Sequence, residues 1–264
     1  MQGAQPTIQV AADAAALSEM AAHEFVCQAQ AAVQARGVFT VALAGGSTPK
    51  SLYARLASTT SLSLEQSPGS ADRGLCVPWD KVHVFWGDER HVPPDHTDSN
   101  YRMAYEAMLS KVPVPPANVH RIKTETPDAH TAAAEYEQEL QSFFRLAPGQ
   151  LPRFDLVLLG MGPDGHTASL FPGTDALHEP TRLVVAPWVE KFHTYRVTLT
   201  LPVLNNAAKG IFLVSGEDKA ETLRAVLQGD HQPDSLPAQG VHPTQGTLLW
   251  LVDRAAARFL RLLK

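Results

Sequence analysis

Residues 154–174 contain an apolar run that leads directly into a glycine-rich loop carrying an aspartate and a histidine. The run from Leu156 to Leu159 predicts a buried strand, and the glycines that follow predict a sharp turn. Strand ends in an open α/β sheet are where ligands bind. A carboxylate and an imidazole at such a place, here Asp164 and His166, can move protons near neutral pH.

Predicted strands and helices alternate along the chain, which indicates a mostly parallel sheet with helices on both faces. The predicted strands are 38–44, 82–86, 119–122, 156–159, 183–186, 196–200, 210–214 and 247–252. The predicted helices are 11–36, 49–57, 100–109, 128–146, 218–227 and a terminal helix from residue 255. We expect surface loops at 58–79, 91–99 and 228–246. No linker divides the chain, so we expect a single α/β domain over residues 1–264.

Composition narrows the class of protein. The net charge is −5 and no cationic block is present, so we expect no nucleic-acid partner. No uncharged apolar run approaches about 18 residues, so we expect no membrane span. Cys27 and Cys76 form no paired motif, which favours reduced thiols in the cytoplasm. The segment Met1–Gln9 lacks a basic region followed by an apolar core, so we expect no signal peptide.

A second candidate site is the segment 44–49, Ala-Gly-Gly-Ser-Thr-Pro, which follows an apolar strand and opens a helix. Gly45 and Gly46 let a ligand approach the backbone closely. We expect Thr48 to cap the helix and the proline after it to occupy the first turn. Free N–H groups around Ser47 would then bind an anion, although an ordinary strand–turn–helix joint has the same composition.

Three cations lie where predicted strands begin or end. Lys219 begins a predicted helix after a strand. A cation there interacts unfavourably with the helix dipole and costs about 0.3–1 kcal/mol, so local stability does not explain the presence of a lysine. Arg90 follows two carboxylates at another strand end, and Arg196 begins a strand. Each also fits an ordinary surface position or a local ion network. Because the strand ends of a parallel sheet meet in one crevice, we expect all three cations in one anion site.

The spacing of Asp164 and His166 allows both side chains to face the same way, and an aspartate can fix the tautomer of a nearby imidazole. The alternative is a capped turn with an exposed histidine. No G-x-S-x-G nucleophile elbow occurs, which favours direct attack by water. The nearby His91, Asp95 and His96 have no metal-ligand spacing, so we expect neither a metal nor a cofactor.

Six segments of the chain together resemble the 6-phosphogluconolactonase family, in the family's order. They are 44–49, 86–90, 98–101, 160–173, 196–202 and 215–219. The most specific is 160–173, Gly-Met-Gly-Pro-Asp-Gly-His-Thr-Ala-Ser-Leu-Phe-Pro-Gly. The segment 44–49 is shared with a wider group of sugar-phosphate enzymes. The likeness extends from about residue 9 to residue 260.

This resemblance implies an α/β fold like that of glucosamine-6-phosphate deaminase and ribose-5-phosphate isomerase. It implies hydrolysis of 6-phospho-D-glucono-1,5-lactone to 6-phosphogluconate, in the oxidative pentose phosphate pathway. It implies that His166 is a general base on water and that Asp164 supports the imidazole. The implied substrate-binding residues are Gly45, Gly46, Ser47, Thr48, Arg90, Arg196 and Lys219. We expect a monomer or a weak homo-oligomer.

Two other functions fit parts of this pattern. A glucosamine-6-phosphate deaminase or isomerase resembles the chain at 164–166, but it carries Asn-Glu-Pro where this chain has Leu170-Phe171-Pro172. Phe171 in place of a carboxylate argues against ring-opening isomerisation. A non-catalytic sugar-phosphate-binding protein needs the anion site but not the acid–base pair, and the presence of both Asp164 and His166 disfavours it.

Overall fold

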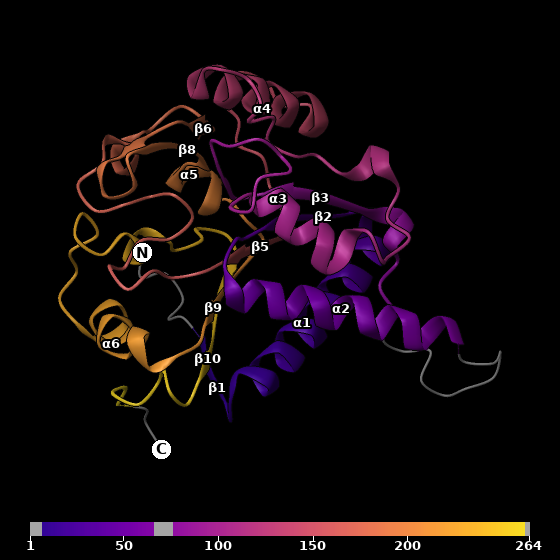
Figure 1. The fold of residues 1–264 in the computed structure, drawn as a ribbon, viewed down its shortest axis with the longest axis horizontal. Coiled ribbons are helices and arrows are strands. Elements are labelled where there is room, and N and C mark those ends of the chain that lie inside the picture. The colour runs from indigo at the N-terminus through magenta and orange to yellow at the C-terminus, as the bar shows by residue number, and fades with distance from the viewer. Residues whose placement is uncertain (1–6, 66–75, 262–264) are drawn as a thin grey trace.

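Two β-sheets organise the protein. The computed structural model describes residues 7–65 and 76–261. The main sheet has six strands in the order β1-β10-β9-β5-β2-β3 (Figure 1). All of its neighbouring strands pair in parallel. Its strands are β1 Thr7–Ala11, β2 Phe39–Leu43, β3 Val82–Trp86, β5 Leu156–Leu159, β9 Lys209–Val214 and β10 Thr247–Asp253.

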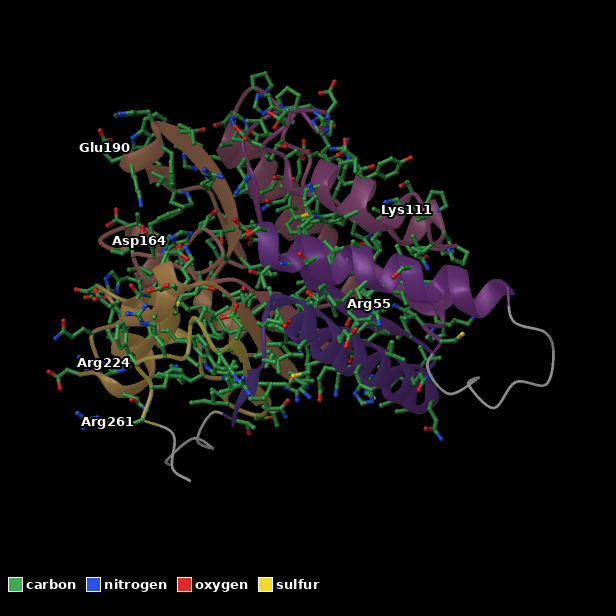
Figure 2. The ribbon with its side chains drawn as sticks, turned by 60° about the horizontal axis from the view of Figure 1, so that its bottom comes forward. Arg55, Lys111, Asp164, Glu190, Arg224 and Arg261 are labelled. Carbon is green, nitrogen blue, oxygen red and sulfur yellow. The ribbon has the colours of Figure 1, made fainter. Side chains whose placement is uncertain are left out.

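Helices cover both sides of this sheet. They are α1 Ala14–Arg36, α2 Ser47–Glu65, α3 Asn100–Ala104, α4 Ala129–Phe144, α5 Leu201–Leu204 and α6 Ala220–Gln228. Figure 1 shows α1 and α2 side by side on one side of β9 and β10, with α6 on the other. Charged side chains such as Lys111, Glu190 and Arg224 lie on the outside (Figure 2). In the described part of the chain, no helix is long and apolar enough to cross a membrane.

A smaller antiparallel sheet adjoins the main one where the chain passes from β3 to β4. It contains β4 Asp88–Arg90, β6 Val184–Val185 and β8 Thr194–Leu199, and β7 Trp188–Val189 forms a hairpin with β8. Gly87 is the junction between the sheets. Its N–H donates to the carbonyl of Leu43 at 2.8 Å, and its carbonyl accepts from the N–H of Leu199 at 2.9 Å. The chain therefore leaves the end of β3 and enters the second sheet with its backbone still paired.

The mostly parallel sheet and most predicted elements are confirmed, but several details are wrong. The helix predicted at 49–57 begins at Ser47 and continues to Glu65, into the predicted loop 58–79. Part of that loop, 66–75, lies outside the described residues. The strand predicted at 119–122 is only an isolated bridge between Val119 and Val84. In place of the predicted terminal helix, residues 254–259 form turns after β10.

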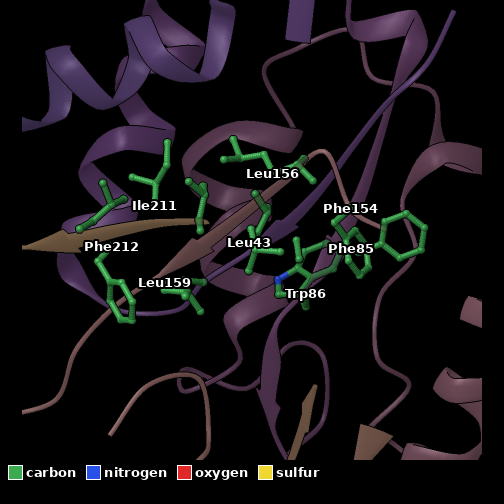
Figure 3. Packing of buried hydrophobic residues seen from close by; sticks show 14 of the residues in the cluster. Leu43, Phe85, Trp86, Phe154, Leu156, Leu159, Ile211 and Phe212 are labelled. Carbon is green, nitrogen blue, oxygen red and sulfur yellow. The ribbon is translucent and has the colours of Figure 1, made fainter. Parts of the chain in front are cut away.

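A continuous apolar core fills the space between the main sheet and its helices. Figure 3 shows part of it, where Leu43, Trp86, Leu156 and Ile211 from four different strands come together. Aromatic rings fill the ends of this region. Phe85 and Phe154 pack edge to face with ring centroids 5.3 Å apart. Because each central strand is buried on both faces, its sequence does not alternate: β5 is wholly apolar, and β2 is apolar except for the buried Thr40.

Two buried tyrosines secure the carboxyl ends of β2 and β3. The Tyr53 hydroxyl, from α2, accepts from the N–H of Ala44 at 3.0 Å and donates to its carbonyl at 2.8 Å. The Tyr136 hydroxyl, from α4, makes the same pair of bonds to Trp86, at 2.9 and 3.1 Å. Burial raises the pKa of both phenols far above the ordinary value. Each hydroxyl therefore satisfies two backbone groups where a strand ends.

Removing the Tyr53 hydroxyl should destabilise the fold. Tyr53→Phe leaves the N–H and carbonyl of Ala44 buried without this partner, at a cost of about 1–3 kcal/mol. Urea denaturation measures the free energy of unfolding. Tyr105→Phe is the matched control, because the Tyr105 side chain is exposed and should change stability little. Equal stability of the two variants would contradict the role given to Tyr53.

A chain of hydrogen bonds joins His83, His120 and Glu139 away from the strand ends. His83 Nδ1 lies 3.0 Å from His120 Nε2, and His120 Nδ1 lies 2.8 Å from Glu139 Oε1. The His120 ring also stacks on Phe85 at 4.3 Å. Burial, and then the neighbouring His120, lower the pKa of His83 below its ordinary value.

This shift predicts the pH dependence of stability. The unfolded chain binds a proton at His83 at higher pH than the folded chain does. Stability should therefore decrease as pH falls from about 7.5 to about 5. His83→Gln should reduce that decrease in urea denaturation at matched pH values. His178→Gln, at an exposed histidine, should keep the full decrease. An unaltered pH dependence in the His83 variant would rule out this origin.

Candidate functional site

The carboxyl ends of β2, β5 and β9, together with β4, surround a cavity of about 340 Å³. The strands are parallel, so their ends meet at one edge of the sheet, as expected for a ligand site. Seven of the expected site residues line this cavity: Gly45, Gly46, Ser47, Thr48, Arg90, His166 and Lys219. Asp164 and Arg196 are not among its lining residues but contact or pair with residues that are.

The first wall of the cavity is the start of α2. The N–H of Lys50 donates to the carbonyl of Gly46 at 3.1 Å, which is the first helical bond. Thr48 therefore lies inside the helix, and the expected capping role of Thr48 is wrong, because Gly46 occupies that position. The N–H groups of Ser47 and Thr48 precede the first helical donor, Lys50, and so have no partner within the helix. Their use by an anion stays a prediction.

Lys219 forms the opposite wall. It ends a 3₁₀ turn, Glu217–Lys219, and so precedes α6 rather than lying in its first turn. Its side chain is largely buried, and Nζ lies 2.8 Å from Asp218 Oδ2. Asp253, at the end of β10, fixes the segment that precedes Lys219. It accepts from the N–H of Gly216 at 3.2 Å and from the Ser215 hydroxyl.

The two arginines are neighbours across the second sheet. Arg90 on β4 pairs in register with Arg196 on β8. Burial, and then the charge of Arg90, lower the pKa of Arg196 below its ordinary value. Arg196 Nε is buried and has no hydrogen-bond partner among residues 7–65 and 76–261, and its guanidinium lies 5.2 Å from the centre of the Phe192 ring. Adjacent like charges repel, so an anion between them would stabilise this arrangement.

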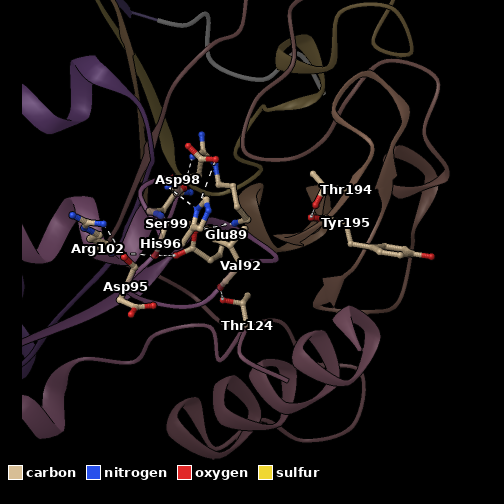
Figure 4. A network of polar contacts seen from close by, with 12 residues as sticks. Glu89, Val92, Asp95, His96, Asp98, Ser99, Arg102, Thr124, Thr194 and Tyr195 are labelled. Atoms are coloured by element: carbon tan, nitrogen blue, oxygen red, sulfur yellow. Dashed lines mark hydrogen bonds and ion pairs between the residues drawn. The ribbon is translucent and has the colours of Figure 1, made fainter. Parts of the chain in front are cut away.

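The two carboxylates before Arg90 have different surroundings. Glu89 is fully buried and accepts from the N–H groups of Asn100 and Tyr101, both at 2.7 Å. It also accepts from the Ser99 hydroxyl at 3.1 Å (Figure 4). Burial raises the pKa of Glu89, and the hydrogen bonds from these backbone N–H groups offset only part of that rise. Glu89 therefore anchors the start of α3. Asp88 instead lines the cavity, where Oδ2 accepts from Ser169 Oγ at 2.7 Å.

The loop after β5 holds the acid–base pair. Asp164 Oδ1 accepts from His166 Nδ1, and the imidazole stacks on Phe171 with centroids 4.0 Å apart. Partial burial raises the Asp164 pKa, but the hydrogen bonds from His166 and Lys191, together with the charge of a protonated His166, outweigh burial and hold it well below its ordinary value. An ionised carboxylate only accepts, so Nδ1 carries the proton. In the neutral form of the imidazole, the lone pair is therefore on Nε2.

Two glycines are required by close approach to site side chains. A Cβ at Gly162 would lie 2.1 Å from His166 Nδ1 and Cε1. A Cβ at Gly45 would lie 2.0 Å from Oδ1 of Asn100, whose amide donates to the carbonyl of Asp88 at 2.9 Å. Both positions have ordinary backbone torsions, so it is the missing side chain, not an unusual conformation, that the site needs.

Sequence reasoning missed three residues at the site. Asp88 and Asn100 line the cavity, and Lys191 Nζ lies 3.1 Å from Asp164 Oδ2. The position of Asp88 at a strand end was a usable signal, although the sequence gives equal weight to a local ion network. Lys191 had no signal, because it lies 27 residues from Asp164 and reaches it only through the β7–β8 hairpin. Within the described residues, no cluster of three metal-ligating side chains occurs.

A larger cavity, of about 960 Å³, lies beside the first one. Asp164, Phe171 and Lys191 line it, together with residues of β6 and β7. His166 lines only the smaller of these two cavities, and Asp164 only the larger. The acid–base pair therefore lies in the wall between them.

Comparisons with known proteins identify the family of the chain. A family model described as glucosamine-6-phosphate isomerases/6-phosphogluconolactonase matches residues 12–250. A protein of Nostoc sp. named 6-phosphogluconolactonase is 42% identical over 250 residues, covering 95% of this chain and 96% of that protein. The solved 6-phosphogluconolactonase of Trypanosoma brucei is 32% identical, with a TM-score of 0.82 over 97% of this chain and 99% of that one.

A more distant structure supports the expected fold class. A monomeric glucosamine-6-phosphate deaminase has a TM-score of 0.77 over 96% of this chain and all of its own, at 20% identity. That likeness shows the fold alone. The family model and the close relatives cover nearly the whole described chain. The chain therefore belongs to the glucosamine-6-phosphate isomerase/6-phosphogluconolactonase family.

Proposed function

We propose that this protein hydrolyses 6-phospho-D-glucono-1,5-lactone to 6-phospho-D-gluconate, the lactonase step of the oxidative pentose phosphate pathway. The observation that carries the proposal is His166 in the cavity wall with its Nδ1 bonded to the Asp164 carboxylate, an arrangement that puts the lone pair of a neutral imidazole on Nε2. An anion-binding helix start and Lys219 line the same cavity. The cytoplasmic location and the monomer or weak homo-oligomer stay predictions.

The proposed reaction uses one imidazole twice. His166 Nε2 takes a proton from water as the water oxygen attacks the lactone carbonyl, giving a tetrahedral oxyanion. When the intermediate collapses, the bond to the ring oxygen breaks and that oxygen takes the proton back from Nε2. Asp164 stabilises the transient imidazolium without accepting its proton. No net proton is held by the protein at the end of this step.

The phosphate of the substrate is a charged group, distant from the reacting carbonyl, to which the protein can bind. We assign it to the N–H groups of Ser47 and Thr48, with Gly45 and Gly46 allowing close approach, and to Lys219. Binding energy gained there positions the ester beside His166. Because Arg90 lines the cavity directly, it is the better placed arginine to meet the substrate, and Arg196, paired with it across β4 and β8, adds positive charge beside it.

Phe171 favours a lactonase over a ring-opening isomerase. It packs flat against the His166 ring, with the two planes 24° apart. The position next to the imidazole is therefore occupied by an apolar ring, which can neither accept nor donate a proton. His166 and Asp164 are then the acid–base pair on this loop, which is sufficient for ester hydrolysis by water.

Removing the imidazole should abolish most of the catalysis. His166→Ala should lower kcat for freshly generated 6-phosphogluconolactone by at least about 100-fold. The assay subtracts spontaneous hydrolysis, and retention of phosphosugar binding shows that the fold is intact. His242→Ala, at an exposed histidine outside the cavity, should keep normal turnover. Near-normal turnover of the His166 variant would remove His166 from the mechanism.

Removing the lysine should weaken recognition of the phosphate. Lys219→Ala should reduce kcat/KM for the phosphorylated lactone by about 10-fold or more, because one charge-assisted contact is lost. Turnover of unphosphorylated gluconolactone should change little. Lys123→Ala, at an exposed lysine, is the control for a lost surface charge. An equal loss on both lactones would contradict the phosphate role.

A further inference from the structure

Lys191 contacts the acid–base pair from a different part of the chain. It lies in the 3₁₀ turn Glu190–Phe192, at the tip of the β7–β8 hairpin. Its Nζ lies 3.1 Å from Asp164 Oδ2, while Asp164 Oδ1 accepts from His166 Nδ1. The two carboxylate oxygens therefore have different partners, and the plane of the carboxylate is fixed at both ends.

The position of Asp164 makes this second contact important. Asp164 lines the larger cavity, over a quarter of its side chain is exposed, and within the described residues Lys191 is the side chain that holds its outer oxygen, Oδ2. A carboxylate held only by His166 can rotate about its terminal torsion, since that torsion has broad minima. Rotation would lengthen the bond to Nδ1 and release the imidazole from its orientation.

The same hairpin tip also supports the imidazole from behind. Phe192 packs edge to face on Phe171, with centroids 5.8 Å apart at 72°. Phe171 in turn stacks on the His166 ring. One turn of the hairpin thus contacts both neighbours of His166, the carboxylate through Lys191 and the aromatic ring through Phe192.

Folding stability does not explain this contact. The Lys191 side chain is 55% exposed, and a half-exposed ion pair contributes little to stability because water screens it. An effect on orientation needs no such contribution, because a misplacement of about 1 Å in a reacting group can lower a rate by about 100-fold.

We propose that Lys191 is a positioning residue for hydrolysis: it fixes the outer oxygen of Asp164, and Asp164 in turn orients the His166 imidazole toward the cavity. This inference rests on the proposed lactonase function for its kinetic consequence. The geometric part, an imidazole held through a carboxylate by a lysine, is independent of the substrate.

The kinetic test separates positioning from binding and from folding. Lys191→Met should lower kcat by about 10- to 100-fold with KM and thermal stability nearly unchanged. Lys191→Arg should restore much of kcat, because a guanidinium can also hold the carboxylate. Lys111→Met is the matched control, since Lys111 is exposed and lies on the opposite side of the molecule from Asp164 (Figure 2). A rise in KM alone, a parallel loss of stability, or unchanged kcat would overturn the proposal.

A spectroscopic test decides the matter even if the lactonase assay of the unaltered protein is negative. The proton on His166 Nδ1, identified by its loss in His166→Ala, should give a slowly exchanging downfield NMR signal in the unaltered protein. That signal should be broadened or lost in Lys191→Met and kept in Lys191→Arg and Lys111→Met. An unchanged signal in Lys191→Met would show that Asp164 orients His166 without the lysine.

Discussion

At the carboxyl edge of a parallel sheet, neighbouring strands run out of ladder partners at the same place. The site lies at this edge, so the protein must satisfy those backbone groups without filling the space beyond them. Tyr53 and Tyr136 do this from two helices, each hydroxyl bonding both the N–H and the carbonyl of one residue. Ala44, directly after β2, and Trp86, the last residue of β3, are thereby fixed, so the loops that follow start from rigid points.

Some charged side chains at this edge stabilise the fold, and others are placed to act on a ligand. Glu89 is buried and its oxygens are taken up by the start of α3, so it is not available to a ligand. The Asp164 side chain is 28% exposed. Its lowered pKa keeps it ionised, and it accepts a hydrogen bond from His166. Arg90 and Arg196 lie side by side with a partly desolvated positive charge. The carboxylates are already partnered, and the cations remain able to bind an anion.

Local sequence was enough to predict most of the main sheet, but not β1 Thr7–Ala11, whose last residue lies where the helix 11–36 was expected to begin. It also predicted seven of the residues that line the cavity. Buried strands are apolar runs and their glycine-rich ends are visible, so the loops at Gly45 and Gly162 could be predicted. Helix ends were less accurate, since Ser, Thr and Leu in residues 58–65 suit both a helix and a loop. The turns after Asp253 share the composition of a helix. Lys191 could not be predicted, because only the pairing of β7 with β8 brings it to Asp164.

Gly45 and Gly162 differ from the glycines that occupy turns with positive φ. Neither needs a left-handed backbone, and each is excluded from carrying even a methyl group by the side chain that faces it. In a saturation mutagenesis library, tolerance at these two positions would depend on the side chain that faces the glycine and not on the backbone torsions of a turn. Second-site suppressors should then arise by shortening Asn100 opposite Gly45. None is available opposite Gly162, because the opposing group is the imidazole itself.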